Sequence, residues 1–141
     1  MPYPFVQSPN MTRSAGRAVD LVVMHTMETE ERFDAAEAVA RWFARPETQV
    51  SAHYCVDADT VVQCVREEDI AWHARGGNAR SVGIELAGRA GQGAGGWRDP
   101  YSTAVLERAA ALAAEVCERH GIPLRWVRAP GLLRGTRGIT G

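Results

Sequence analysis

The sequence predicts an α/β fold of the α+β kind, in which one mixed β-sheet is covered by helices. Residues 19–24 form a short apolar run, typical of a strand buried on both faces. Two stretches with helical apolar spacing begin near Asp34 and after Asp99, and short alternating segments lie between them. Because both patterns occur in one chain of 141 residues, a sheet with helices packed on it is the architecture that buries both.

The first strand and the first helix are delimited by polar residues and a proline. The strand at 19–24 runs directly into His25. The helix is expected to begin at Asp34, with Glu37 as the partner in a capping box, and to end before Pro46.

A hairpin and a further strand are expected in the middle of the chain. Residues 50–56 and 61–65 are expected to pair across a turn at 57–60. Residues 81–87 alternate apolar side chains with glycine and glutamate, which predicts another strand.

The second helix has signals at both ends. Asp99 is placed to cap its first turn, and Pro100 suits the first helical position. Gly121 is expected to end it, and a weaker extended tail follows.

Composition and charge exclude several classes of protein. Apolar residues make up 45% of the chain, and 16 basic side chains against 17 acidic ones give a net charge of −1. The chain therefore lacks the excess of basic residues that is typical of nucleic-acid-binding proteins. No apolar run reaches the ~18 residues that a transmembrane helix needs. The start, MPYPFVQSPN, lacks the basic and apolar regions of a secretory signal. We therefore expect a soluble monomer made in the cytoplasm, with an irregular lead-in at 1–18 and one domain at 19–141.

Two motifs are interpreted as structural. The three cysteines, Cys55, Cys64 and Cys117, are odd in number and show no CxxC spacing, so buried thiols are favoured over a disulfide or a metal site. The glycines at 91–96 spell GxGxxG, but four residues separate them from the next helix, so a flexible loop is favoured over a dinucleotide site.

Two polar residues interrupt apolar strands and are candidates for chemistry. His25 ends the first strand, and Glu85 lies within the strand at 81–87. Strand ends line ligand clefts in α/β sheets, so a metal ligand and a general base are one interpretation. A satisfied structural histidine and a solvent-facing glutamate are the alternatives, and these two residues alone do not establish an enzyme.

Six phrases, taken together, resemble a known family. They are VVMHT (22–26), VSAHY (50–54), DADTVVQCV (57–65), AWHA (71–74), NARSVGIELAG (78–88) and ERHGIP (118–123). In this order and spacing they resemble the zinc-dependent N-acetylmuramoyl-L-alanine amidases, a family of phage endolysins, bacterial cell-wall recycling enzymes and animal peptidoglycan recognition proteins. The likeness covers about residues 19–141.

The resemblance implies a zinc hydrolase acting on peptidoglycan or a muropeptide. It makes His25 a zinc ligand and Glu85 the base that activates a zinc-bound water. Ala52 stands where other branches have a tyrosine, which places this chain in the glutamate branch. Trp72 and His73 are implied to line the substrate groove, with Asn78 beside it.

The resemblance also implies that the site needs residues beyond Gly141. In the family the second zinc ligand directly follows a phrase like Gly138–Gly141, and the third is an aspartate or cysteine further on. Neither His53 nor His120 is expected to replace them, so we expect the domain at 19–141 to be C-terminally incomplete, with weak zinc binding and little hydrolysis.

Two alternatives to an amidase remain at this point. One is a non-catalytic peptidoglycan-binding module, and the other is an incomplete, poorly folded fragment. If the chain is an endolysin, it acts on the cell wall; if it is a recycling enzyme, it acts on soluble muropeptides.

Overall fold

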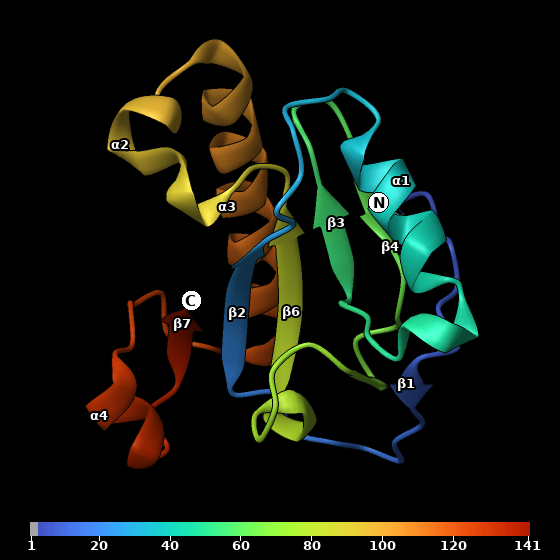
Figure 1. The fold of residues 1–141 in the computed structure, drawn as a ribbon. Helices are drawn as coiled ribbons and strands as arrows, with labels where there is room; N and C mark the ends of the chain where they lie inside the picture. Colours follow the sequence, from blue (N-terminus) through green and yellow to red (C-terminus); the bar gives the residue numbers. More distant parts are fainter. Residues whose placement is uncertain (1–2) are drawn as a thin grey trace.

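A five-stranded mixed sheet forms the centre of the molecule in the computed structural model, which describes residues 3–141 (Figure 1). The strand order is β4-β3-β6-β2-β7. The strands are β2 (Leu21–Thr26), β3 (Tyr54–Val56), β4 (Val61–Gln63), β6 (Ser81–Leu86) and β7 (Gly138–Thr140). Only β4 is antiparallel to its neighbour, and the other pairs are parallel. The predicted mixed sheet with covering helices is confirmed.

The two main helices cover the sheet unequally. Helix α3 (Pro100–His120) packs across one face against β6, β2 and β3. Helix α1 (Ala35–Phe43) lies on the opposite face and contacts β3 and β4 (Figure 1). The half of that face formed by β2 and β6 is therefore left uncovered by α1.

Strand alternation divides the core into two clusters, one on each face. The cluster under α3 joins strand residues such as Val22 and Ile84 to Val105, Leu112 and Val116 of the helix. The smaller cluster under α1 joins Ala36, Ala40 and Phe43 to Cys55 and Val62. Successive strand residues point to opposite faces, so β3 contributes Tyr54 and Val56 to the first cluster and Cys55 to the second.

The ends of α3 are as predicted, but the start of α1 is not. The Asp99 carboxylate accepts a hydrogen bond from the Ser102 amide at 2.7 Å, and Gly121 ends α3 in the left-handed conformation. The expected capping box of α1 is wrong, since Asp34 makes no capping hydrogen bond and instead pairs with the exposed Arg32.

A carboxylate from the hairpin takes over the capping of α1. Oδ2 of Asp57 accepts the Ala36 amide at 2.9 Å, while Oδ1 accepts the amides of Asp59 and Thr60. One buried side chain therefore holds both the hairpin turn and the first turn of the helix.

The lead-in is more ordered than expected. Within residues 3–18, β1 (Met11–Thr12) pairs with β5 (Ile70–Ala71), and the buried Asn10 donates to the carbonyls of Phe43 and Arg45. The expectation of a wholly irregular segment is corrected for these residues, and residues 1–2 lie outside the described part. The remaining α-helices of residues 3–141 are the short α2 (Gly93–Gly96), where a flexible loop was expected, and α4 (Ala129–Leu133).

Two further features bear on the sequence expectations. The three cysteines are buried free thiols, as predicted. Among residues 3–141, no helix combines the length and the apolarity that a bilayer crossing requires.

Candidate active site

His25 and Glu85 are direct neighbours across the two central strands. The parallel register of β2 and β6 pairs His25 with Glu85, and β3 places Cys55 beside Glu85 on its other side. Paired residues in register point to the same face, and Cys55 belongs to the cluster under α1. Both His25 and Glu85 therefore project from the α1 face, on the half that the helix leaves open.

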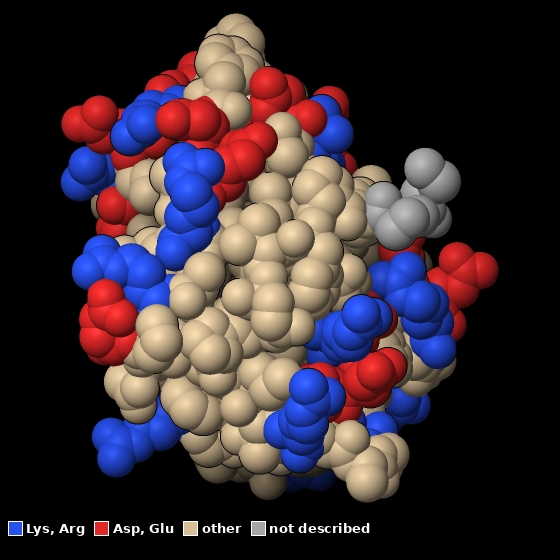
Figure 2. Space-filling model, turned by 90° about the vertical axis from the view of Figure 1, so that its right-hand side faces the viewer, with Lys and Arg blue, Asp and Glu red and all other residues tan. Residues whose placement is uncertain are grey.

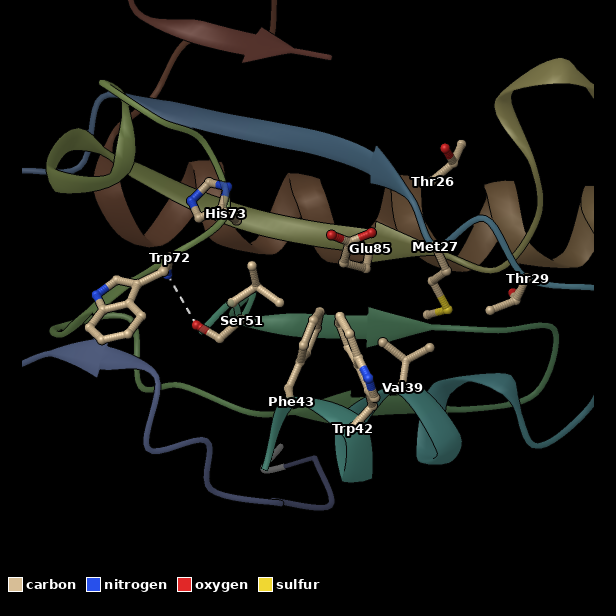
Figure 3. Close-up of a pocket in the computed structure, with 11 residues that line it drawn as sticks. Thr26, Met27, Thr29, Val39, Trp42, Phe43, Ser51, Trp72, His73 and Glu85 are labelled. Atoms are coloured by element: carbon tan, nitrogen blue, oxygen red, sulfur yellow. Dashed lines mark hydrogen bonds between the residues drawn. The ribbon is translucent and has the colours of Figure 1, made fainter. Parts of the chain in front are cut away.

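A cleft of about 440 Å³ runs along this open half (Figure 3). One wall is apolar and comes from α1, whereas Glu85 and His73 lie on the opposite side in Figure 3. Its lining is Thr26, Met27, Thr29, Val39, Trp42, Phe43, Val50, Ser51, Trp72, His73 and Glu85. A concave site with one apolar wall and a few convergent polar groups is typical of small-ligand sites.

The surface around α1 is largely uncharged. Figure 2 shows the side of the molecule that lies to the right in Figure 1, where charged side chains lie toward the borders and leave a broad neutral area between them. Positive and negative side chains alternate along these borders, so the described residues of this face form no continuous basic patch.

The pKa of Glu85 lies near neutral pH. Burial, and secondarily the negative charge of Glu28, raises the pKa of Glu85 to about 7. A carboxyl group that titrates near the working pH accepts and returns protons most effectively. A strongly shifted carboxyl group in a cleft also marks a candidate functional site.

Three polar groups form a chain that starts at His25. Nε2 of His25 lies 2.9 Å from Nδ1 of His73, and Nε2 of His73 lies 3.0 Å from Oγ of Ser81. Burial lowers the pKa of His25, and burial together with the charges of His53, His25 and Arg17 lowers the pKa of His73 to about 3. Both imidazoles are therefore neutral at pH 7, the form in which a histidine binds a metal.

The loop that carries Trp72 and His73 is held by Asn78. Oδ1 of Asn78 accepts the amides of His73 and Ala74 at 3.0 and 2.7 Å. Trp72 donates its indole N–H to Oγ1 of Thr12. The structure brings Trp72 and His73 to the cleft, while Asn78 borders an adjoining hollow and shapes the loop.

The other two histidines are engaged elsewhere. Nδ1 of the buried His53 accepts the Gly83 amide at 3.0 Å, and its Nε2 lies 3.0 Å from the Asp69 carbonyl oxygen. His120 lies at the end of α3, where it contacts Glu67 at 3.2 Å. Neither is placed to act as a metal ligand beside His25.

The site fits zinc in part. No hydrogen bond from the described residues reaches Nδ1 of His25, so this nitrogen is available as a ligand. Within residues 3–141, however, no three His, Cys, Asp or Glu side chains gather into a metal-binding group. Because a hydrolytic zinc site holds three protein ligands, this part of the chain supplies an incomplete set.

Sequence reasoning missed the residues that support the histidines. Ser81 and Gly83 share one face of β6 with Glu85, and a Cβ atom at Gly83 would lie 2.6 Å from the His73 ring. A glycine inside a strand is the available signal, since it often marks a close approach. The ring that approaches Gly83 belongs to His73, in another segment of the chain, so the sequence alone does not identify it.

Comparison with known proteins decides the family. Residues 15–135 match the Amidase_2 family, N-acetylmuramoyl-L-alanine amidase. The chain belongs to this family. The matched region begins four residues before the boundary expected at residue 19, and the family is generally zinc-dependent.

Individual members of the family resemble the chain in sequence or in fold. N-acetylmuramoyl-L-alanine amidase A of Achromobacter lyticus is 37% identical over 111 residues, which are 77% of this chain and 57% of that protein. The chain thus matches little more than half the length of this relative. The catalytic domain of XlyA has a TM-score of 0.73 at 20% identity, over 99% of this chain and 84% of that one. Drosophila peptidoglycan recognition protein SA has a TM-score of 0.62 at 19% identity, over 100% of this chain and 74% of that one. At these identities the two structures establish the fold alone.

Proposed function

We propose that this chain carries part of the active site of a peptidoglycan amidase. Such an enzyme cuts the amide bond between N-acetylmuramic acid and L-alanine. The observation that carries the proposal is the register pairing of His25 with Glu85 on the open half of the α1 face. Family membership and the name of the Achromobacter relative support the choice of bond.

Glu85 is proposed as the general base. Its pKa of about 7 leaves a sizeable ionised fraction at neutral pH, and its carboxylate faces the cleft (Figure 3). In the reaction, a water oxygen bonds to the lactyl carbonyl carbon while Glu85 accepts the water proton. The carbon–nitrogen bond then breaks and Glu85 delivers the proton to the alanine nitrogen. The products are a lactyl carboxylic acid and a free amine.

His25 is proposed as one zinc ligand, through Nδ1. When bound, zinc supplies a water of lowered pKa and polarises the carbonyl. The remaining ligands are proposed to follow Gly141, and the sheet supports this location. Thr140 pairs with Val23, so a continuation of β7 in the same register would lay its second residue beside His25, on the same face.

Trp72, His73 and Asn78 are proposed to shape the substrate groove. Trp72 and His73 border the cleft directly, and the wall of α1 opposite them includes Trp42, which is 47% exposed. An exposed indole suits the apolar face of a sugar ring or a peptide stem. The roles of Trp72 and His73 therefore combine binding with positioning, whereas Asn78 acts through the loop.

A non-catalytic binding module is the second candidate. The specific observation in its favour is the lack of a three-residue metal-binding group among residues 3–141. In that case the cleft binds muropeptides without cutting them.

The test uses the complete gene product that contains this chain, with purified peptidoglycan as substrate. An amidase releases peptides with a new N-terminal L-alanine and creates no new reducing sugar ends, and a chelator stops the release. Sedimentation with insoluble peptidoglycan without such release supports the binding module. New reducing ends, or new amino termini other than L-alanine, would contradict the proposed bond.

A further inference from the structure

We propose that Ser81, Gly83 and His73 form a positioning unit that fixes His25 as the Nε2–H tautomer and keeps its Nδ1 bare for the metal. The inference rests on the proposed function in one respect: that function supplies the metal that Nδ1 of His25 would bind. The tautomer itself is a property of the metal-free chain.

The chain of donors begins at Ser81, whose hydroxyl has one hydrogen. Oγ of Ser81 lies 2.7 Å from the Gly77 carbonyl oxygen, which accepts but never donates, so the hydroxyl hydrogen points there. Oγ also lies 3.0 Å from Nε2 of His73. Since the hydroxyl hydrogen is already used, Oγ accepts in this second bond, and Nε2 of His73 carries the proton.

The same logic passes from His73 to His25. A neutral imidazole has one N–H, so His73 with a proton on Nε2 has a bare Nδ1. That atom lies 2.9 Å from Nε2 of His25, which must donate for the bond to form. The His25 proton is then on Nε2, and its Nδ1 carries a free lone pair. A charged His73 is disfavoured because its ring is half-buried between the imidazoles of His25 and His53, whose centroids lie 5.2 and 5.9 Å away.

Packing holds His73 in the place that this chain requires. The ring lies over Gly83, where an added Cβ atom would be 2.6 Å from both Cγ and Nδ1 of the ring. The backbone of His73 is fixed from the other side by Asn78. Alternate residues of β6 thus supply a hydroxyl at Ser81, space at Gly83 and the proposed base at Glu85. Supporting groups of this kind commonly set the tautomer of a metal-binding histidine.

The direct test is a long-range proton–nitrogen correlation spectrum of the metal-free, ¹⁵N-labelled chain at neutral pH, with His25→Gln and His73→Gln used to assign the signals. Both rings are expected to be protonated on Nε2 and bare on Nδ1. A His25 protonated on Nδ1 would overturn the proposal. This spectrum needs no amidase activity, so its failure is distinct from failure of the proposed function.

A matched pair of serine variants tests the role of Ser81. Ser81→Ala removes the acceptor of the His73 proton, whereas Ser8→Ala removes a buried hydroxyl that donates to the backbone carbonyl of Phe43 at 2.6 Å rather than to an imidazole. Ser81→Ala is expected to turn His25 into a mixture of tautomers and to weaken zinc binding by the complete gene product about 10-fold or more. Ser8→Ala should change neither. An unaltered His25 tautomer in folded Ser81→Ala would contradict the role of Ser81 in the positioning unit. If that variant does not fold, the spectrum of the unmutated chain decides whether the proposal holds.

Discussion

Replacing Glu85 by glutamine should stabilise the metal-free chain, and more so as the pH rises. In the folded chain burial raises the pKa of Glu85 from its ordinary 4.5 to about 7. Between these values the folded state holds a proton that the unfolded state has released, so the free energy of unfolding falls as the pH increases. The stabilisation is fully present below pH 4.5 and is lost as the pH passes through 7.

The size of the effect follows from the same two values. At 1.36 kcal/mol for each pH unit, a rise in pKa from 4.5 to about 7 corresponds to about 3 kcal/mol. Glutamine has a similar shape and does not titrate. The stability difference between Glu85→Gln and the unmutated chain should therefore grow by about 3 kcal/mol between pH 4.5 and pH 8.5, on the order of 10 °C in Tm.

Chemical denaturation across this pH range, with a chelator present, measures the difference. Carboxyl groups that do not interact with Glu85, such as Asp57, titrate alike in both proteins and cancel. Glu107→Gln serves as the control, because Glu107 is exposed on α3, and its difference from the unmutated chain should be flat. If the difference in the free energy of unfolding between Glu85→Gln and the unmutated chain changes by less than about 1 kcal/mol over this range, the claim that burial raises the pKa of Glu85 is refuted.

Three further predictions concern the metal, the buried Asp57 and the half-buried Glu67. The 141-residue chain alone should bind zinc weakly, so stoichiometric zinc in equilibrium dialysis at nanomolar free metal would contradict the incomplete ligand set. Asp57→Ala should cost about 1–3 kcal/mol in denaturant unfolding, since it uncaps α1 and the hairpin turn together. Asp34→Ala removes a carboxylate that pairs with the exposed Arg32, so it should cost less than about 0.5 kcal/mol. Equal costs for the two variants would disprove the capping role of Asp57. Burial raises the pKa of Glu67, but the hydrogen bond and charge of Arg119 outweigh this and hold it below its ordinary 4.5. Because the Arg119 side chain is 44% exposed, Arg119→Gln should destabilise the chain by only about 1 kcal/mol at pH 7. In the unmutated chain this stabilisation is complete above pH 4.5 and lost as the pH falls below it, so an acid-unfolding curve that does not respond to Arg119→Gln would contradict the pairing.

Elements with local signals were predictable from the sequence. The apolar run before His25 became β2, and Asp99, Pro100 and Gly121 mark the ends of α3 as expected. Each of these signals depends on residues within one turn or one strand, so no knowledge of distant contacts is needed.

Elements that depend on distant partners were not predictable. The cap of α1 comes from Asp57, 21 residues beyond the amide that it binds, and β1 forms only because β5 lies beside it. The same holds for the site, since the pairing of His25 with Glu85 joins residues 60 positions apart. Sequence alone placed both residues at strand positions, and the resemblance suggested that they meet, but the parallel register is a property of the folded sheet.

The most direct measurement of the central claim is the rate of L-alanine amine release from peptidoglycan by the complete gene product and its Glu85→Gln variant. If Glu85 is the base beside a His25-bound zinc, kcat should fall about 10²–10⁴-fold, while zinc content is kept and the variant is at least as stable as the unmutated protein at pH 7. Glu107→Gln should retain full activity. A Glu85→Gln enzyme that still turns over at more than about a tenth of the unmutated rate would contradict the assignment of the base and the site built around it.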